Sequence, residues 1–210
     1  DQTHTVGSFA ATAEGDREWN VGASWRRPWP NLATAGQAVR EDLPVVHVSW
    51  NDASAFCVHF GLALPSECQW EYACCAGDTA RFPWGDDPAG GAAYANVKDS
   101  SYARRFPAPG RTFPFDDGEG MLARAGSKRP NAWGLHDMIG SVEEWTADAR
   151  GPLRTTEGDD ERASTAGNGR VVRGGAWLSS SEIANCTSRS GLAPHARRDH
   201  VGFRVVMNVP

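Results

Sequence analysis

Cysteines, histidines and paired carboxylates are the residues from which most metal and acid–base sites are built. The chain has five cysteines, and Cys74 and Cys75 are adjacent, but no second pair stands at zinc-binding spacing. The six histidines form no H-x-x-x-H or H-E-x-x-H arrangement. A G-x-S-x-G turn for a nucleophilic serine is also absent from the sequence. Local motifs therefore predict neither a zinc centre nor a serine hydrolase.

Length and composition fit one folded domain with an apolar core. The chain has 210 residues, of which 40% are hydrophobic, and its net charge is -5 without a basic stripe. Phosphate binding needs clustered Lys and Arg, so we expect no nucleic-acid partner. No apolar run approaches the ~20 residues of a membrane helix, so no membrane span is predicted. The first residues, DQTHTVGSFA, do not have the charged start and apolar core of a signal peptide.

Two helices are predicted near the middle of the chain. The segment 51–60 places apolar residues on one face, with Ser49 or Asn51 as its cap. The segment 66–76 opens with Ser66 and Gln69 at capping-box spacing. These two helices are the only elements with both a start signal and a helical period.

The remaining elements are predicted to be short strands joined by long loops. Strands are expected at Leu43–Trp50, Arg170–Trp177 and Gly202–Val206. Residues 1–44, and about a hundred residues after Gly77, are interpreted as loop because Pro, Gly, Asp and Asn recur every few positions. The predicted class is an irregular α+β domain with two main helices, short antiparallel strands and long ordered loops.

Nine segments together resemble one family. They are GASWRRPWP at 22–30, PVVHVSWNDASAFC at 44–57, LPSECQWEYAC at 64–74, FPWGDD at 82–87, ANV at 95–97, DDGEG at 116–120, NAWGLHDMIGSVEEWTAD at 131–148, VVRGGAW at 171–177 and VGFRVV at 201–206. In order and spacing they resemble the formylglycine-generating enzyme (sulfatase-modifying factor) family. The resemblance implies a C-type-lectin-like fold in a single domain over 1–210, and it implies that the opening strands of the family domain precede this chain.

The family's chemistry depends on copper held by two thiolates. The resemblance places those thiolates after the strand Gly174-Gly175-Ala176-Trp177, at Ser179 and Ala184. Neither residue binds Cu(I), which prefers soft ligands. The serine of the family's oxygen-handling site is replaced by Ala176, while Arg189 matches its active-site arginine. We therefore expect no copper and no formylglycine-generating activity.

The resemblance also implies two structural calcium sites. Asn96, the Val97 carbonyl, Asp117 and the Glu119 carbonyl match the first site. Ser141, the Val142 carbonyl and Glu144 match the second, where serine replaces the usual asparagine. Oxygen ligands from separate loops suit a hard cation. The alternative for the first site is a hydrogen-bonded network without metal.

Cys74 and Cys186 match positions that form a disulfide in many family members. Such a bond would favour an exported protein or another oxidising compartment. The alternative is two buried free thiols. Cys57, Cys68 and Cys75 are expected to remain thiols.

Three functions are compatible with these residues. The first is a scaffold that binds a protein or small-molecule ligand on the segment 177–200, as in variable proteins of the family that are diversified by retroelements. The second is a metal-dependent oxidoreductase of a divergent branch, and the third is a catalytically silent paralogue that binds sulfatases. We favour the first, because VVRGGAW and VGFRVV anchor both ends of the segment. Its expected ligand-binding residues are Trp177, Leu178, Ser179, Ile183, Arg189, Ser190, His195, Arg198 and His200.

Overall fold

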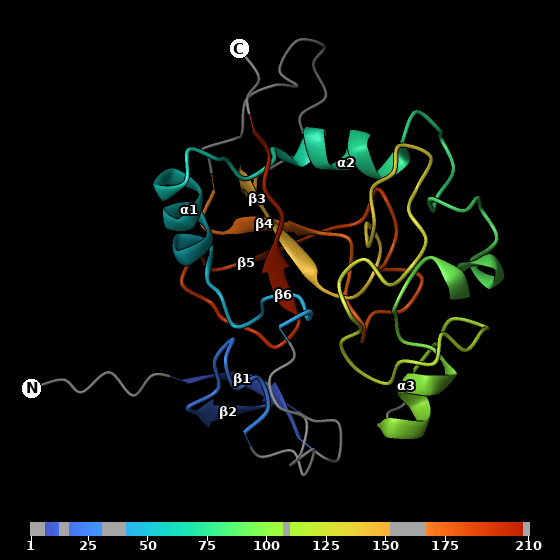
Figure 1. The fold of residues 1–210 in the computed structure, drawn as a ribbon, viewed down its shortest axis with the longest axis horizontal. Coiled ribbons are helices and arrows are strands. Elements are labelled where there is room, and N and C mark those ends of the chain that lie inside the picture. Colours follow the sequence, from blue (N-terminus) through green and yellow to red (C-terminus); the bar gives the residue numbers. More distant parts are fainter. Residues whose placement is uncertain (1–6, 13–16, 31–40, 107–109, 152–166, 208–210) are drawn as a thin grey trace, which may run out of the picture.

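A computed structural model of the protein describes residues 7–12, 17–30, 41–106, 110–151 and 167–207. Two capped helices pack against the central sheet (Figure 1). Helix α1 spans Trp50–His59 and α2 spans Glu67–Cys75. Each begins with a complete capping box: Ser49 pairs with Asp52, and Ser66 pairs with Gln69. Both predicted helices are thus confirmed, with Ser49 as the cap of α1.

A mixed sheet of four strands lies at the centre (Figure 1). Its order is β5 (Arg189–Leu192), β4 (Arg170–Arg173), β3 (Glu143–Ala149), β6 (Val201–Phe203). The pairs β3–β4 and β4–β5 are antiparallel, whereas β3 and β6 run parallel. The predicted α+β class is confirmed, but the strands are not all antiparallel. The chain passes from β5 at one edge of the sheet to β6 at the other edge, where β6 runs in the same direction as β3.

An N-terminal hairpin is attached to the far side of this sheet from α2 (Figure 1). It consists of β1 (Gly7–Ala11) and β2 (Arg17–Val21), paired antiparallel. The Ala11 N–H donates to Asp199 Oδ2 at 2.8 Å, and Phe9 bridges to Arg198. The prediction of loop for residues 1–44 was therefore wrong at these two strands, which are held by tertiary contacts with the residues just before β6.

Three buried clusters form the core of the described residues, each around one tryptophan. Trp70, Trp145 and Trp177 are 1%, 0% and 1% exposed, respectively. Helices α1 and α2 both contact β3, so their buried faces close over the sheet. Burial of these indoles provides much of the apolar area that stabilises a loop-rich domain.

The predicted strand at Leu43–Trp50 was wrong. His47 has a left-handed backbone with φ 58°, which interrupts any strand, and Trp50 already begins α1. The segment stays extended in part and buries Val46, which is 1% exposed. A run of β-branched residues here marks burial rather than sheet pairing.

The long loop region after Gly77 contains short elements that the sequence pattern did not reveal. A 3₁₀ turn, η1, spans Pro88–Ala93, and α3 spans Ser100–Arg105. Asp87 and Asp99 cap them with their carboxylates. Both are too short for a periodic signal. Among the described residues, no helix is long and apolar enough to cross a membrane.

Candidate functional site

The two positions that would bear copper-binding thiolates are packed into the interior. Ser179 is 5% exposed, and its Oγ accepts a hydrogen bond from the Ala176 N–H at 3.1 Å. Ala184 is fully buried, and a Cβ added at Gly175 would meet its Cα at 2.7 Å. A hydroxyl already used by the backbone and a methyl group supply no soft ligand here.

Arg189, the counterpart of the family's active-site arginine, is fully engaged by the protein. It forms a bidentate pair with Glu67, with both N–O distances at 2.7 Å. Its Nη1 donates to the Gly151 carbonyl at 2.9 Å. The hydrogen bond with Glu67 raises the pKa of the Arg189 guanidinium. The arginine therefore joins the start of α2 to β5 rather than standing open to a ligand.

The predicted ligand-binding segment is only partly surface. Trp177 and Ser179 lie in the core, so neither presents an exposed side chain to a ligand in this structure. Trp177 packs against Tyr102 and Phe106, with ring centroids 5.7 Å from each. The segment also contains β5, whose hydrogen bonds with β4 fix Arg189 and Ser190.

The other predicted residues divide between half-buried and exposed positions. Arg198 lies over the Phe9 ring at 4.6 Å, and His200 Nδ1 is 2.8 Å from Asp199 Oδ1. Leu178 is half-buried and packs against the cluster around Trp177. Ile183 is 50% exposed. His195 is also exposed, so the segment offers two separate surface stretches.

The first stretch is a turn, residues 180–188, that is braced from within by Asn185. The Asn185 Oδ1 accepts hydrogen bonds from the Thr187 and Ser188 N–H groups, at 3.2 and 2.9 Å. Its Nδ2 donates to the Glu182 carbonyl at 3.1 Å. With Asn185 buried beneath it, this turn directs Glu182, Ile183 and Thr187 outward in a fixed arrangement.

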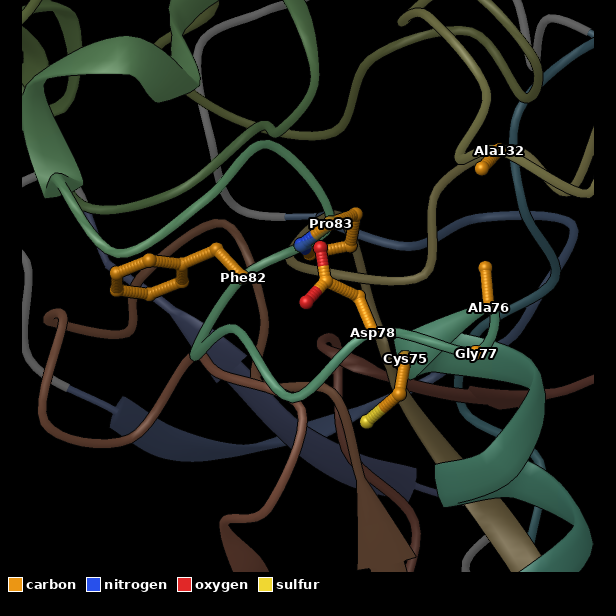
Figure 2. Close-up of a pocket in the computed structure, with 7 residues that line it drawn as sticks. All are labelled: Cys75, Ala76, Gly77, Asp78, Phe82, Pro83 and Ala132. Carbon is orange, nitrogen blue, oxygen red and sulfur yellow. The ribbon is translucent and has the colours of Figure 1, made fainter.

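A pocket of about 300 Å³ lies at the C-terminal end of α2 (Figure 2). It is lined by Cys75, Ala76, Gly77, Asp78, Phe82, Pro83 and Ala132. Arg81 connects the two features, since its Nη2 donates to the Ser181 carbonyl at 2.6 Å and its carbonyl accepts from Cys186 N–H at 3.1 Å. Sequence reasoning missed the pocket because its walls come from the end of α2 and from loops without a motif; the adjacent Cys74 and Cys75 were its one visible sign.

The first predicted calcium site has donors that fit a hard cation. Asn96 is 1% exposed, and its Oδ1 is buried without a hydrogen-bond partner. The carboxylate of Asp117 is buried too, and burial raises its pKa to about 6. An unpartnered buried oxygen beside a buried carboxylate is the pattern that a bound Ca²⁺ would satisfy. Lys128 Nζ lies 3.9 Å from Asp117 Oδ1, so an internal ammonium competes for the same carboxylate.

The remaining ligands of that site lie close by. Asp117 Oδ2 accepts from the Val97 N–H at 3.1 Å, so the two predicted ligand residues are neighbours. The Glu119 carbonyl accepts from Ser101 Oγ at 2.8 Å. The structure therefore brings all four predicted residues of the first site together.

The second predicted calcium site is arranged differently. Glu144 receives Arg204 Nη2 at 2.8 Å and Arg204 Nε at 2.5 Å, and Trp70 Nε1 donates to it at 2.7 Å. Ser141 has a left-handed backbone with φ 57° and precedes Val142, whose side chain enters the core. Arg204 neutralises the carboxylate that a cation would need.

All five cysteines are free thiols in this structure. Cys74 and Cys186 are buried in the same cluster as Trp70, and their thiols are hydrogen-bonded. The structure thus brings the predicted pair together without a bond, and the disulfide stays a prediction. Cys57 is buried on the inner face of α1, whereas Cys68 is exposed on α2.

Comparison with known proteins settles the family. The family model for the sulfatase-modifying factor enzyme 1-like domain matches residues 3–209. The chain belongs to this family. The expected resemblance is thereby confirmed over nearly the whole chain.

Curated relatives include active enzymes and inactive paralogues at similar identity. The formylglycine-generating enzyme of Streptomyces coelicolor is 36% identical over 87% of this chain and 58% of its own length. The mouse protein named inactive C-alpha-formylglycine-generating enzyme 2 is 35% identical over 87% of this chain and 54% of its own length. The chain spans about half the length of the curated relatives it matches. Identity alone therefore does not separate activity from its loss.

Solved structures support the fold. PvdO from Pseudomonas aeruginosa matches with a TM-score of 0.68 at 24% identity, covering 97% of this chain and 72% of that one. Treponema denticola variable protein 1 matches with a TM-score of 0.67 at 19% identity, covering 96% and 91%. These likenesses confirm the irregular α+β architecture and, at such identities, nothing about ligands.

Proposed function

We propose that this domain is a ligand-binding scaffold that lacks the copper oxidase chemistry of its family. The observation that carries the proposal is the pair Ser179 and Ala184, which are buried and have no sulfur where two thiolates would be required. Strand β4 precedes these two positions and β5 follows them, and the two strands pair in the sheet. Such a domain keeps its rigid frame and can serve recognition instead of catalysis.

The binding surface we propose consists of the turn 180–188 and the adjoining pocket. Asn185 braces the turn with several hydrogen bonds, so presenting its side chains costs little conformational entropy on binding. Arg81 joins the turn to the pocket rim. A fixed convex turn beside a small cavity is a common arrangement for recognising a protein loop or a small molecule.

The chemistry of this surface favours a ligand with an apolar part and hydrogen-bond donors. Ile183 supplies an exposed apolar side chain. A hydrogen bond from Ser180 lowers the pKa of Glu182 to about 2, so its carboxylate stays ionised. Arg111 pairs with that carboxylate at 2.9 Å on an exposed edge, where the pair is easily exchanged for ligand contacts.

A catalytically silent paralogue that binds sulfatases is the second candidate. The 35% identity to the inactive mouse paralogue favours it, although the active enzymes match equally well. A metal-dependent oxidoreductase has less support, because no group of three His, Cys, Asp or Glu among the described residues is placed to hold a metal ion. We also propose calcium as a structural ion at Asn96 and Asp117, on the strength of the orphaned Asn96 oxygen.

A displayed random-peptide library, selected on the immobilised protein in calcium buffer, would test the surface. Binders should lose about tenfold or more in affinity for a Glu182→Ala, Ile183→Ala, Thr187→Ala variant, a loss of about 1.4 kcal/mol. Val58→Ala is the matched control, because Val58 is an exposed apolar residue on α1. Binders that tolerate the triple variant, with circular dichroism unchanged, would place the binding surface elsewhere.

A sulfatase-type peptide, offered in the same assay, separates the two candidates. Binding of that peptide, together with loss in the triple variant, would favour the silent paralogue. Its failure to compete with the selected peptides would favour a scaffold for other ligands.

A further inference from the structure

Three cysteines from two distant segments of the sequence lie close together beside the pocket. Cys74 and Cys75 end α2, and Cys186 lies within the turn 180–188. Cys74 and Cys186 are 0% exposed in the cluster around Trp70, and Cys75 packs against that cluster from outside. Cys75 also lines the pocket, next to Gly77 and Asp78 (Figure 2). Cys75 is therefore the one of the three that borders a cavity open to solvent.

The three sulfur atoms are not equivalent. Cys186 accepts hydrogen bonds from the Cys74 thiol and then from the Cys75 thiol, and Arg173 lies near it. These contacts favour its thiolate, and the pKa of Cys186 is lowered. Burial, together with the neighbouring Cys186, raises the pKa of Cys75 to about 11. The outer thiol thus holds its proton while the inner sulfur is the base beside it.

We propose that Cys75 is a thiol–disulfide exchange site, which takes a low-molecular-weight disulfide through the pocket, and that Cys186 resolves the resulting mixed disulfide. The pocket volume of about 300 Å³ is at the small end of ligand cavities, which suits one half of such a disulfide. The pocket borders Cys75, whereas Cys74 and Cys186 are fully buried. Cys75 is therefore the cysteine that a disulfide from solvent would meet first.

The exchange balances without any other reactant. Cys75 gives its proton to the Cys186 thiolate and attacks one sulfur of the disulfide RSSR; the S–S bond of RSSR breaks, and RS⁻ leaves with the proton from Cys186. The Cys186 thiolate then attacks the Cys75 sulfur and expels the second RS⁻. Two cysteine sulfurs are oxidised to one disulfide and RSSR is reduced to two thiols.

Cys186 is the shared partner of two neighbours, which links this site to the predicted Cys74–Cys186 disulfide. A Cys75–Cys186 bond can pass to Cys74–Cys186 when the Cys74 sulfur attacks the Cys186 sulfur. The Cys75–Cys186 bond then breaks, and the leaving Cys75 sulfur takes the proton of the Cys74 thiol, which frees Cys75 as a thiol. The same three residues can therefore hold a buried crosslink and return the outer thiol to the pocket.

The probe is glutathione disulfide, added to the fully reduced protein. All proteins carry Cys68→Ser, because Cys68 is an exposed cysteine on the same helix and would be modified on its own account. Mass spectrometry of acid-quenched, non-reduced samples follows adducts and internal disulfides over time. The parent should form an internal disulfide and retain no glutathione. Adding Cys186→Ser should trap one glutathione on Cys75, and adding Cys75→Ser should slow all oxidation by about tenfold or more.

A Cys74→Ser variant makes the test independent of how well the Cys186 variant folds. It keeps Cys75 and Cys186, so we expect the internal disulfide to form at a rate similar to that of the parent. Absence of that disulfide in a folded Cys74→Ser protein would overturn the proposal. Oxidation of the Cys75→Ser variant as fast as the parent would overturn it too, since Cys74 and Cys186 would then be reached by another route.

Discussion

Arg173 shows how a single buried charge is held in this chain. Its side chain is fully buried, and it donates to the carbonyls of Cys186 and Thr187, both at 2.8 Å. It also pairs with Glu71 and lies 3.7 Å from Glu67. A desolvated guanidinium is tolerated only with this many partners. Arg173 therefore ties α2 to the turn 180–188.

Replacing Arg173 by Met should destabilise the protein by about 3–5 kcal/mol, because Glu71 and several buried carbonyls lose their donor. Urea unfolding followed by tryptophan fluorescence measures the change. Arg104→Met is the control, since Arg104 pairs with Asp116 on the open surface and its loss should leave the midpoint unchanged. Equal midpoints for the Arg173 variant and the parent would show that the buried network is dispensable.

The proposed calcium site depends on the carboxylate of Asp117. Its pKa, raised to about 6 by burial, exceeds the usual 3.8, so the native state favours the protonated form. Ionisation between those values therefore costs stability as the pH rises, unless a cation compensates. Ca²⁺ binds only the ionised carboxylate, so its effect belongs above pH 6.

Chelation should lower the melting temperature at pH 7.5 and have little effect at pH 5, where Asp117 is protonated. Differential scanning fluorimetry with calcium or with chelator measures both. Asp117→Asn should abolish the calcium effect, whereas Asp116→Asn, at an exposed neighbouring carboxylate, should retain it. A melting curve insensitive to chelator at pH 7.5 would favour a metal-free network in which Lys128 alone balances the charge.

The elements differ in how much of them the sequence could predict. Helices α1 and α2 were predictable because capping boxes at Ser49 and Ser66 act within four residues. The hairpin β1–β2 was not, because its docking depends on Asp199 far along the chain. The positive φ of His47 is likewise imposed by tertiary packing, through its N–H bond to the Arg198 carbonyl.

Close approach between elements makes Gly140 a sensitive position. Gly140 has φ 79°, and a Cβ there would meet the Asn96 carbonyl oxygen at 2.1 Å. Gly134 has a similar φ of 81° but nothing within 4 Å of its Cβ position. An alanine at Gly134 would therefore meet backbone strain alone, whereas an alanine at Gly140 would meet backbone strain and a steric clash.

Gly134→Ala should cost about 1–2 kcal/mol from left-handed strain alone. Gly140→Ala should cost about 1–3 kcal/mol more, because the bridge between Asn96 and Gly140 must separate. Chemical denaturation of the two variants and the parent measures the difference. Equal losses would mean that the contact between these loops is soft.

At the scale of the whole molecule, the fold brings together residues that no local pattern connects. The resemblance to the family predicted that Asn96, Val97, Asp117 and Glu119 lie close together, and the sequence itself shows the lack of thiols at Ser179 and Ala184. The burial of Trp177 and the pairing of Arg189 with Glu67 could not, since both depend on packing across the sheet. The pocket beside Cys75 could not be predicted either, because its walls come from separate loops.

The protein should fail to form formylglycine. Formylglycine formation in this family needs Cu(I) on two thiolates, and Ser179 and Ala184 provide a used hydroxyl and a methyl group. A peptide with a sulfatase-type cysteine, incubated with the protein, copper, reductant and oxygen, should therefore keep its cysteine by mass spectrometry. The Streptomyces coelicolor enzyme, assayed in parallel, provides the positive control. Formylglycine above a no-protein control would show that other residues, with Cys186 as the nearest thiol, hold the copper instead.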